Sequence, residues 1–368
     1  MDTLAVGAVT LLVGKNASGK SRTLNVINGL AGLLSATTKL VFKSGDYWVQ
    51  FKDGPTLYEY ELVYMDAHVT KERFSRNGEM LLDRGSGGVG RLLAEKTQQI
   101  LEFQTPPGGL AAVNRRDSIQ HGYFELLHAW GKGVRHFQFG TPLGKDKLAI
   151  LTKDKPIEFD PRNTDQVIAV FRQGLTKFGD EFVRGVITDM GAVGYNLEEV
   201  GLKAPQSLML TIEPTPAGEV VVLYVKEKEL SGITDQIDMS QGMFRALSVI
   251  IHLNYSQRSE QPSCILIDDI GEGLDFDRSC ALIDLLMSKA REGGVQLIMS
   301  TNDRFVMNRV PLQYWSVIYR DGNVCHFFNY ENSRKKFEAF KLTGMNNFDF
   351  FATDFVRSQL GEEISNLR

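Results

Sequence analysis

Eight residues near the start of the chain have the types and spacing of a phosphate-binding loop. They run from Gly14 to Ser21 and fit the pattern G-x-x-x-x-G-K-[ST]. Glycines allow successive backbone N–H groups to point at one phosphate, and Lys20 reaches the β- and γ-phosphates of a nucleotide. The Ser21 hydroxyl supplies an oxygen ligand for Mg²⁺. The motif predicts nucleotide contacts from Gly14, Asn16, Ala17, Ser18, Gly19, Lys20, Ser21 and Arg22.

The segments on either side of this loop have the composition that positions such a site. The apolar run Val9 to Val13 predicts a buried strand. The following segment, residues 23–28, predicts a helix whose Leu24 and Ile27 face inward. A strand–loop–helix unit is the context in which the motif binds phosphate, because the helix N-terminus adds a favourable dipole. Without that context, the same residues indicate only a glycine-rich turn.

Two adjacent carboxylates follow a second apolar run. Residues 265–267 predict a buried strand, and Asp268 and Asp269 stand at its end. Beside a phosphate-binding loop, the first carboxylate holds Mg²⁺ directly or through water, and the second orients the attacking water. Asp268 is therefore a candidate metal ligand together with Ser21, and Asp269 is a candidate catalytic carboxylate. A plain acidic cap at the end of a strand is the other interpretation.

The remaining pattern predicts parallel strands in the later part of the chain and a β-rich region before them. Strands at 264–267 and 295–299 flank a predicted helix at 278–290, so both should lie parallel to the strand at 9–13. Other strands are expected at 39–43, 47–51, 57–64, 207–212 and 219–225, with a hairpin turn at Asp53-Gly54. Other helices are expected from Arg115 onward, at 164–177, at 180–190 and at 241–255. The polar stretch 71–91 predicts a loop or an exposed hairpin.

The composition is that of an ordinary folded protein of 368 residues. Hydrophobic residues make up 43% of the chain and charged residues 23%, which is enough apolar material for one large domain or two. A formal net charge of −4 argues against a dominant, nonspecific binder of polyanions. No apolar stretch approaches ~20 residues and no signal peptide precedes the first strand, so we expect a cytoplasmic protein without membrane association. The thiols Cys264, Cys280 and Cys325 lack metal-ligand spacing and are expected to be buried and reduced.

Three further segments complete a recognisable order of motifs. Residues 239–243 (MSQGM) open an apolar helix, residues 268–275 (DDIGEGLD) continue the carboxylate pair, and residues 297–303 (LIMSTND) contain the next strand and its end. Together with the phosphate-binding loop, they resemble the signature, the Walker B motif with its D-loop, and the switch of ABC-type ATPase heads of the RecF, SMC and OLD kind. The resemblance implies that the nucleotide is ATP, bound with Mg²⁺.

In this family the signature contacts the γ-phosphate held by the other subunit. The resemblance assigns that role to Ser240, Gln241 and Gly242, and it places Asp275 in the D-loop. A hydroxyl, an unobstructed glycine N–H and a helix N-terminus all favour an anion. A simple helix cap is the other interpretation of Ser240.

The switch segment differs from the commonest family pattern at one position. Many members carry a histidine where this chain has Asn302, and an amide can hydrogen-bond the γ-phosphate but cannot take up a proton at neutral pH. The catalytic set implied by the resemblance is therefore Asp269, Asn302 and Lys20. Gln104 is a candidate for the family's Q-loop glutamine, although an exposed loop glutamine fits its position as well.

The resemblance also implies an architecture. We expect an α/β P-loop NTPase fold of the ABC-head type, with a mixed sheet, a RecA-like lobe and a β-rich and helical insertion. Residues 1–110 and 258–345 are expected to form the nucleotide-binding lobe, residues 111–257 the helical signature lobe with a β-hairpin, and residues 346–368 a C-terminal tail. No fused exporter, long coiled coil or Toprim nuclease domain is expected. The phenylalanines of the last part indicate core packing or a partner-docking surface: Phe348, Phe350, Phe351 and Phe355.

These expectations favour an ATP-driven switch. Two copies are expected to close head-to-tail around two ATP–Mg²⁺ and to gate a separate effector protein, for example in bacterial phage defence, or a nucleic-acid site. A second hypothesis is a RecF-like DNA-repair ATPase that binds DNA through basic residues, although these equally fit scattered surface charge: Arg73, Arg76, Arg84, Arg91, Arg115 and Arg116. A third is a nucleotide-dependent scaffold that does not hydrolyse ATP.

Overall fold

The computed structural model describes residues 3–151, 160–205, 219–260 and 262–358, which form two compact units. Unit 1 contains residues 1–25 and 134–368, and unit 2 contains residues 26–133. The boundary falls inside helix α1 (Lys20–Leu34), between Asn25 and Val26. This division differs from the expected lobes, because residues 26–110 and 111–133 belong to one unit. The functional assignment of the lobes stays a prediction.

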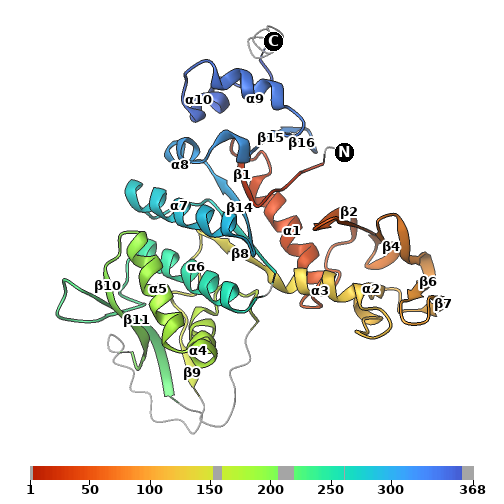
Figure 1. The fold of residues 1–368 in the computed structure, drawn as a ribbon, viewed down its shortest axis with the longest axis horizontal. Helices are drawn as coiled ribbons and strands as arrows, with labels where there is room; N and C mark the ends of the chain where they lie inside the picture. The colour runs from red at the N-terminus through yellow and green to blue at the C-terminus, as the bar shows by residue number, and fades with distance from the viewer. Residues whose placement is uncertain (1–2, 152–159, 206–218, 261, 359–368) are drawn as a thin grey trace. The chain divides into compact units, whose positions relative to one another are not determined.

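The centre of unit 1 is a six-stranded sheet in the order β16-β15-β1-β14-β13-β8 (Figure 1). Its strands are β1 (Val9–Val13), β8 (Val134–Gln138), β13 (Ser263–Asp268), β14 (Val295–Thr301), β15 (Trp315–Asp321) and β16 (Val324–Asn329). β1 is parallel to β14 and β15, and β13 is parallel to β14 and β8, which confirms the expected parallel arrangement. Only β16 joins antiparallel, to β15. β15, which the sequence analysis did not predict, also lies beside β1 in this sheet.

Helices of unit 1 pack on this sheet because packing buries their apolar faces away from water. The helices are α4 (Val167–Phe178), α5 (Asp180–Ala192), α6 (Gln241–Arg258), α7 (Phe276–Glu292) and α8 (Arg304–Arg309). Every residue of α6 from Gly242 to Asn254 is buried, as expected for a helix that is surrounded by protein on all sides. Figure 1 shows α4, α5 and α6 together on one side of unit 1. Inward residues of the strands, such as Leu11, Ile267 and Met299, share one core with these helices.

A smaller antiparallel sheet and a C-terminal helical segment complete unit 1. The sheet contains β9 (Ala149–Leu151), β10 (Leu197–Lys203), β11 (Glu219–Glu227) and β12 (Thr234–Asp235). The expected strand at 207–212 lies outside the described residues. A short 3₁₀ turn (Leu312–Tyr314) precedes β15, and α9 (Arg334–Lys341) and α10 (Asn347–Ala352) follow β16. Phe337, Phe350 and Phe355 are buried there, which confirms core packing for the described aromatic residues of this segment.

Unit 2 is an antiparallel meander of six strands in sequence order. They are β2 (Ser44–Asp53), β3 (Thr56–Met65), β4 (His68–Arg76), β5 (Glu79–Arg84), β6 (Val89–Ala94) and β7 (Gln99–Gln104), with a 3₁₀ turn at Ser86–Gly88. Helices α2 (Ala111–Asn114) and α3 (Tyr123–Gly133) and the second half of α1 contribute to its core. The hairpin turn after Asp53 is confirmed. Residues 39–43 are not a strand. In the stretch 71–91 the hairpin alternative is correct, because β4 and β5 pair antiparallel, but this hairpin is not simply exposed, since Phe74, Leu81 and Leu82 are buried in the core.

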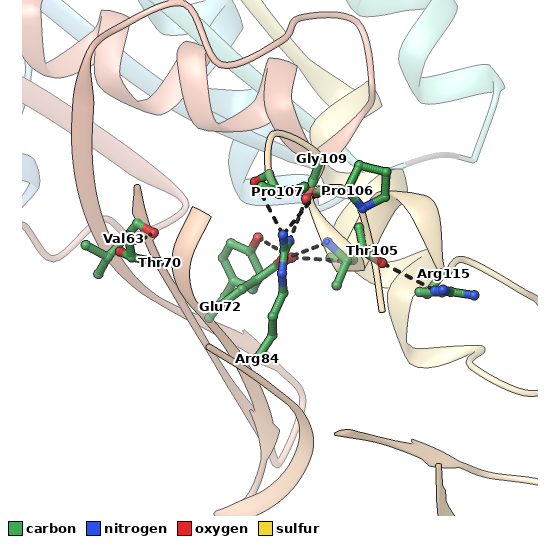
Figure 2. A network of polar contacts seen from close by, with 12 residues as sticks. Val63, Thr70, Glu72, Arg84, Thr105, Pro106, Pro107, Gly109 and Arg115 are labelled. Atoms are coloured by element: carbon green, nitrogen blue, oxygen red, sulfur yellow. Dashed lines mark hydrogen bonds and ion pairs between the residues drawn. The ribbon is translucent and has the colours of Figure 1, made fainter. Parts of the chain in front are cut away.

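An ion pair with no exposed side-chain surface lies inside unit 2. Arg84 Nη1 donates to Glu72 Oε2 at 3.1 Å, and both side chains are 0% exposed. Figure 2 shows further contacts with the segment before α2: Arg84 donates to the carbonyls of Pro106, Pro107 and Gly109. The carboxylate of Glu72 accepts from the N–H groups of Ala111 (2.7 Å) and Ala112 (2.9 Å). The pair therefore fixes the start of α2 against the sheet.

Candidate nucleotide-binding site

The phosphate-binding loop emerges from the carboxyl end of β1, which is buried along its whole length. Ala17 (φ 62°) and Gly19 (φ 111°) are left-handed, which turns successive peptide groups to the same side. A Cβ atom at Gly14 would lie 2.9 Å from the carbonyl oxygen of Ile318 and would also collide with Ser18 Oγ, so only glycine fits. The Ser18 hydroxyl is buried and has no hydrogen-bond partner among the described residues. The loop is thus shaped for an anion at its open side.

Lys20, the first residue of α1, is 6% exposed and turns back over the loop. Its ammonium group donates to the carbonyl oxygens of Gly14 (2.8 Å) and Lys15 (3.3 Å) and to Asn302 Oδ1 (2.7 Å). Burial lowers the pKa of Lys20, and the nearby carboxylates Asp269 and Asp268 oppose that shift. The cation therefore sits between the loop and the carboxyl ends of the neighbouring strands.

The two adjacent carboxylates lie in different environments. Asp268 ends β13, is buried, and accepts a hydrogen bond from Ser300 Oγ at 2.5 Å. Asp269 is half-buried and left-handed (φ 55°), and its N–H donates to the same Ser300 hydroxyl at 3.0 Å. Burial, followed by the charge of Asp268, raises the pKa of Asp269, and Lys20 opposes this shift. A non-glycine residue held at positive φ stores strain, which is common where a side chain must be aimed.

Asn302 joins the two motifs. It follows β14, directly after Thr301, and its side chain is exposed. Besides accepting from Lys20, it donates from Nδ2 to Asp269 Oδ1 at 3.4 Å. The parallel register of β1, β14 and β13 places all three side chains at one edge of the sheet. The structure thus brings together the lysine of the predicted phosphate-binding loop, the second carboxylate and the amide of the predicted switch, with Lys20 and Asn302 282 residues apart in the sequence.

The signature segment and the D-loop pack against one another. A Cβ atom at Gly242 would collide with the carbonyl oxygen of Gly273, and Arg245 Nη1 donates to the carbonyl oxygen of Glu272 at 2.7 Å. Ser240 is exposed and caps α6, because its hydroxyl accepts from the Met243 N–H at 3.2 Å. The helix-cap interpretation is therefore correct as far as local structure goes, and it leaves the exposed hydroxyl free to act at the α6 N-terminus.

The remaining residues of the predicted set lie at the ends of secondary-structure elements. Asp275 caps α7 by accepting from the Arg278 N–H, which lowers the pKa of Asp275. Gln241 donates from Nε2 to the carbonyl oxygen of Thr141 at 3.3 Å. Ser21 and Arg22 are exposed in the first turn of α1.

A glutamine that the sequence analysis missed lies beside the carboxylates. Gln138 ends β8 directly opposite Asp268 on β13, and the Phe139 N–H donates to the carbonyl oxygen of Asp268 at 3.1 Å. The signal was weak, because residues 134–138 (VRHFQ) contain only two apolar residues and follow the helix ending at Gly133 directly. Gln104 ends β7 in unit 2 and is exposed, so its role stays a prediction.

The arginines considered for DNA binding are largely engaged within unit 2. Arg73 pairs with Asp83, Arg76 with Glu79 and Glu95, Arg84 with Glu72, Arg91 with Glu102, and Arg116 with Glu125. The sixth, Arg115, donates to Thr105 Oγ1 (Figure 2) and to the carbonyl oxygen of Gln104. A side chain that already faces a carboxylate is a weak partner for a phosphate, because the acidic group repels it.

The donor set fits ATP with Mg²⁺. Among the described residues no group of three or more His, Cys, Asp and Glu side chains could hold a metal ion alone. Mg²⁺ does not require such a cage, since it keeps water and phosphate oxygens and takes one or two oxygen ligands from the protein. Ser21 and Asp268 would supply these two oxygens. No helix within the described ranges is both long and apolar enough to cross a membrane.

Solved structures with the same arrangement of strands and helices are SMC heads. The structure resembles a crystal structure of an SMC head bound to the C-winged helix domain of ScpA, with a TM-score of 0.52 and 13% sequence identity, over 88% of this chain and 91% of that chain. The fold is that of an SMC head domain. The expected ABC-type head and its mixed α/β architecture are thereby confirmed.

Two further SMC heads are similar at lower scores. The head with an extended coiled coil from Pyrococcus furiosus, bound to the C-terminal domain of ScpA, has a TM-score of 0.48 and 12% identity over 92% of this chain and 94% of that chain. The head from Thermotoga maritima has a TM-score of 0.41 and 13% identity over 89% and 92%. No protein-family profile and no curated protein matches the sequence. At such identities the SMC-head likeness concerns the fold.

Proposed function

We propose that this chain is an ATP-binding and ATP-hydrolysing switch whose two copies close around two ATP–Mg²⁺. The observation that carries the proposal is the chain of contacts from Lys20 to Asn302 to Asp269 at the carboxyl edge of the sheet. Three motifs that are far apart in the sequence meet there within hydrogen-bonding distance. A glycine-rich turn without a ligand would not need a buried lysine, a strained carboxylate and an amide converging on it.

Each residue then has a defined role in binding. The loop N–H groups and Lys20 hold the β- and γ-phosphates, and Lys20 exchanges its present carbonyl acceptors for phosphate oxygens. Ser21 and Asp268 hold Mg²⁺, which, when bound, neutralises charge on the phosphate oxygens. Ser300 keeps Asp268 oriented through its hydroxyl.

Hydrolysis is assigned to the second carboxylate. Asp269 orients the attacking water and accepts its proton, and a raised pKa makes it a better base than a solvated aspartate. Asn302 hydrogen-bonds the γ-phosphate through its amide and holds Asp269 in place. Gln138, opposite Asp268, is a further candidate for positioning the water or Mg²⁺.

Dimerisation rests on the position of Ser240. Its hydroxyl is exposed at the N-terminus of the 18-residue helix α6, where the helix dipole favours an anion. Closed twofold symmetry would place it over the nucleotide of the second copy and give two equivalent composite sites. The similar SMC heads are bound to domains of ScpA, so we also propose a separate partner protein for this chain. The paired arginines give no support to the DNA-repair hypothesis.

The decisive experiment replaces Ser240 with arginine. Ser240→Arg should leave ATP binding by the monomer nearly intact and abolish ATP-dependent dimerisation and turnover, because the side chain fills the space of the γ-phosphate contact. Ser288 is an exposed serine near the C-terminal end of α7, and Ser288→Arg is the matched control. Light scattering and phosphate release measure both variants. Normal ATP-dependent turnover by Ser240→Arg would remove the ground for a composite site.

Mixing the variants adds a test of symmetry. Lys20→Ala and Ser240→Arg subunits are each inactive alone, but a mixed dimer regains one site in which both residues are intact. Partial recovery of ATPase activity in the mixture is expected. A mixture as inactive as its components would mean that Ser240 serves its own chain's nucleotide.

A further inference from the structure

A shallow groove of about 560 Å³ runs between α7 and α8 in unit 1. It lies outside the residues assigned above to ATP and Mg²⁺. The residues that matter to the argument are Phe276, Cys280 and Asp284 on α7 and Phe305, Asn308 and Arg309 on α8. On α7 they recur every fourth residue, so they form one stripe along the helix.

Two phenylalanines form the apolar end of this groove. Phe276 is 54% exposed and Phe305 is 42% exposed, and their rings meet edge to face with centroids 5.0 Å apart. Most other phenylalanines of unit 1 in the described ranges are buried or pack against the core. A pair of large aromatic rings that face water together is a feature of surfaces that become covered.

The position of the pair connects it to the proposed composite site. Phe276 directly follows Asp275 of the D-loop, and Phe305 comes three residues after Asn302. The D-loop in turn contacts the N-terminal part of α6 through the hydrogen bond from Arg245 to the carbonyl oxygen of Glu272. The groove therefore opens beside the segments that a second copy would cover if the proposed function is correct.

The charges beside the rings are divided between the two helices. Asp277 and Asp284 lie on α7, whereas Arg304 and Arg309 lie on α8. Arg309 pairs with Asp284 across the groove, and the Arg304 guanidinium lies 4.7 Å from the centre of the Phe305 ring. The Asp284–Arg309 pair neutralises itself within one copy, and a twofold axis along the groove would set Asp277 on α7 of one copy against α8 of the other, where Arg304 carries the opposite charge. The groove is thus complementary to itself in charge.

We infer that the groove between α7 and α8 is the apolar part of the interface with a second copy of this chain. The inference rests on the proposed function, since ATP binding is what brings the two copies together. Phe276 and Phe305 of one copy pack against the same pair of the other. Hydrophobic contact then adds to the nucleotide-mediated contacts and sets how tightly the dimer closes.

The test uses single charge substitutions in the full chain. Phe276→Glu and Phe305→Glu are compared with Leu342→Glu, a 66% exposed leucine at the end of α9 and outside the groove. Sedimentation with a non-hydrolysable ATP analogue and Mg²⁺ gives the dimer dissociation constant, and a fluorescent ATP analogue gives the affinity of the monomer.

The dissociation constant should rise about 100-fold for the two groove variants. A buried, unpaired carboxylate costs at least about tenfold per copy, and symmetry places the change twice in each dimer. Nucleotide affinity of the monomer should not change, and Leu342→Glu should dimerise like the wild type. Wild-type dimer formation with unchanged dissociation constants for both groove variants overturns the inference and leaves the proposed function standing. A wild type that stays monomeric with ATP analogue overturns both.

The thiol of Cys280 gives a second, independent readout. It lines the groove and is partly exposed, and burial raises its pKa, so its alkylation rate at one fixed pH reports access. Alkylation by N-ethylmaleimide, mapped by mass spectrometry, should slow at least about tenfold in the wild-type dimer. It should not slow in Ser240→Arg, which binds nucleotide as a monomer. Equal rates in dimer and monomer would show that the groove stays open.

Discussion

The two units differ in how their buried polar groups are hydrogen-bonded. In unit 2, both oxygens of Glu72 accept two hydrogen bonds each, and only Nε of Arg84 has no partner among the described residues (Figure 2). In unit 1, the Ser18 hydroxyl has no such partner, Lys20 is held by two loop carbonyls and an exposed amide, and Asp269 is strained. A satisfied network stabilises a fold, whereas an unpartnered hydroxyl and a lysine whose carbonyl acceptors can be exchanged for phosphate oxygens are suited to a ligand.

The largest effect on stability is expected when the buried cation of unit 2, Arg84, is removed. Arg84→Met leaves the Glu72 carboxylate buried without its counter-charge, and three carbonyl oxygens lose their donor. We expect a loss of about 3–5 kcal/mol in the free energy of unfolding. Arg73→Met is the matched control: its pair with Asp83 is 45% and 51% exposed, so about 1 kcal/mol or less is expected. Urea titrations decide it, and equal losses for the two variants would contradict a structural role for the buried pair.

The corresponding change in unit 1 should act on the ligand and spare the fold. Lys20→Ala removes the charge placed against the β- and γ-phosphates, and ATP affinity should fall at least about 100-fold, with turnover lost. The control is Lys15→Ala, an exposed lysine of the same loop that contributes only its carbonyl to the site. Calorimetry measures affinity. Unchanged ATP binding by a folded Lys20→Ala protein would defeat the assignment of the loop.

The third prediction separates binding from hydrolysis within unit 1. Asp269→Asn keeps the side-chain volume but removes the charge that orients water, so hydrolysis should fall ~100-fold while ATP binding survives. The ATP-bound dimer should accumulate. Glu272→Gln, a change in the neighbouring D-loop carboxylate, should have a much smaller effect. A wild-type rate for Asp269→Asn together with a slow Glu272→Gln would move the catalytic role to Glu272.

The sequence predicted the strands that carry the candidate site better than it predicted unit 2. Gly14 to Ser21, Asp268–Asp269 and Asn302 each follow a short apolar run, and the parallel register then requires their side chains to share one edge of the sheet. Such motifs carry their own local geometry. In the stretch 71–91, charged residues alternate with Phe74, Leu81 and Leu82, and the glycines at 85–90 conceal the strand pattern. Tertiary pairing between β4, β5 and β6 decides the structure there.

Long-range partners were the other part that the sequence could not provide. Nothing in the run 134–138 announces that Gln138 faces Asp268, because that contact depends on a strand 130 residues later joining the same sheet. The same holds for Arg84, whose pairing with Glu72 requires two strands and the loop before α2 to meet. Hydrophobic patterns in the sequence predict the strands and helices, whereas contacts between distant residues depend on the order of the strands in the sheet.

The smallest expected effect tests whether unmet polar capacity alone marks a ligand site. His252 of α6 is fully buried in unit 1, and neither ring nitrogen has a partner among the described residues. Its ring packs edge to face on Phe137 with centroids 5.3 Å apart, inside the hydrophobic core and not at the carboxyl edge of the sheet. Burial, with the charge of Arg135 adding to it, lowers the pKa of His252 to about 3.

That pKa sets a pH dependence with a definite sign. The unfolded chain binds a proton at His252 below its ordinary pKa of about 6.5, whereas the folded protein does not until about pH 3. Stability is therefore present above pH 6.5 and is lost as the pH falls, by about 2 kcal/mol at pH 5 relative to pH 7.5. His252→Leu should remove that share of the acid sensitivity and leave ATP affinity unchanged, and His68→Gln, an exposed histidine of unit 2, should change neither. Urea midpoints at the two pH values measure the difference. If His252→Leu weakened ATP binding instead, an unpartnered buried group would be enough to indicate a ligand site. The backbone strain at Asp269 would then not be needed to distinguish the candidate site in unit 1 from the buried network in unit 2.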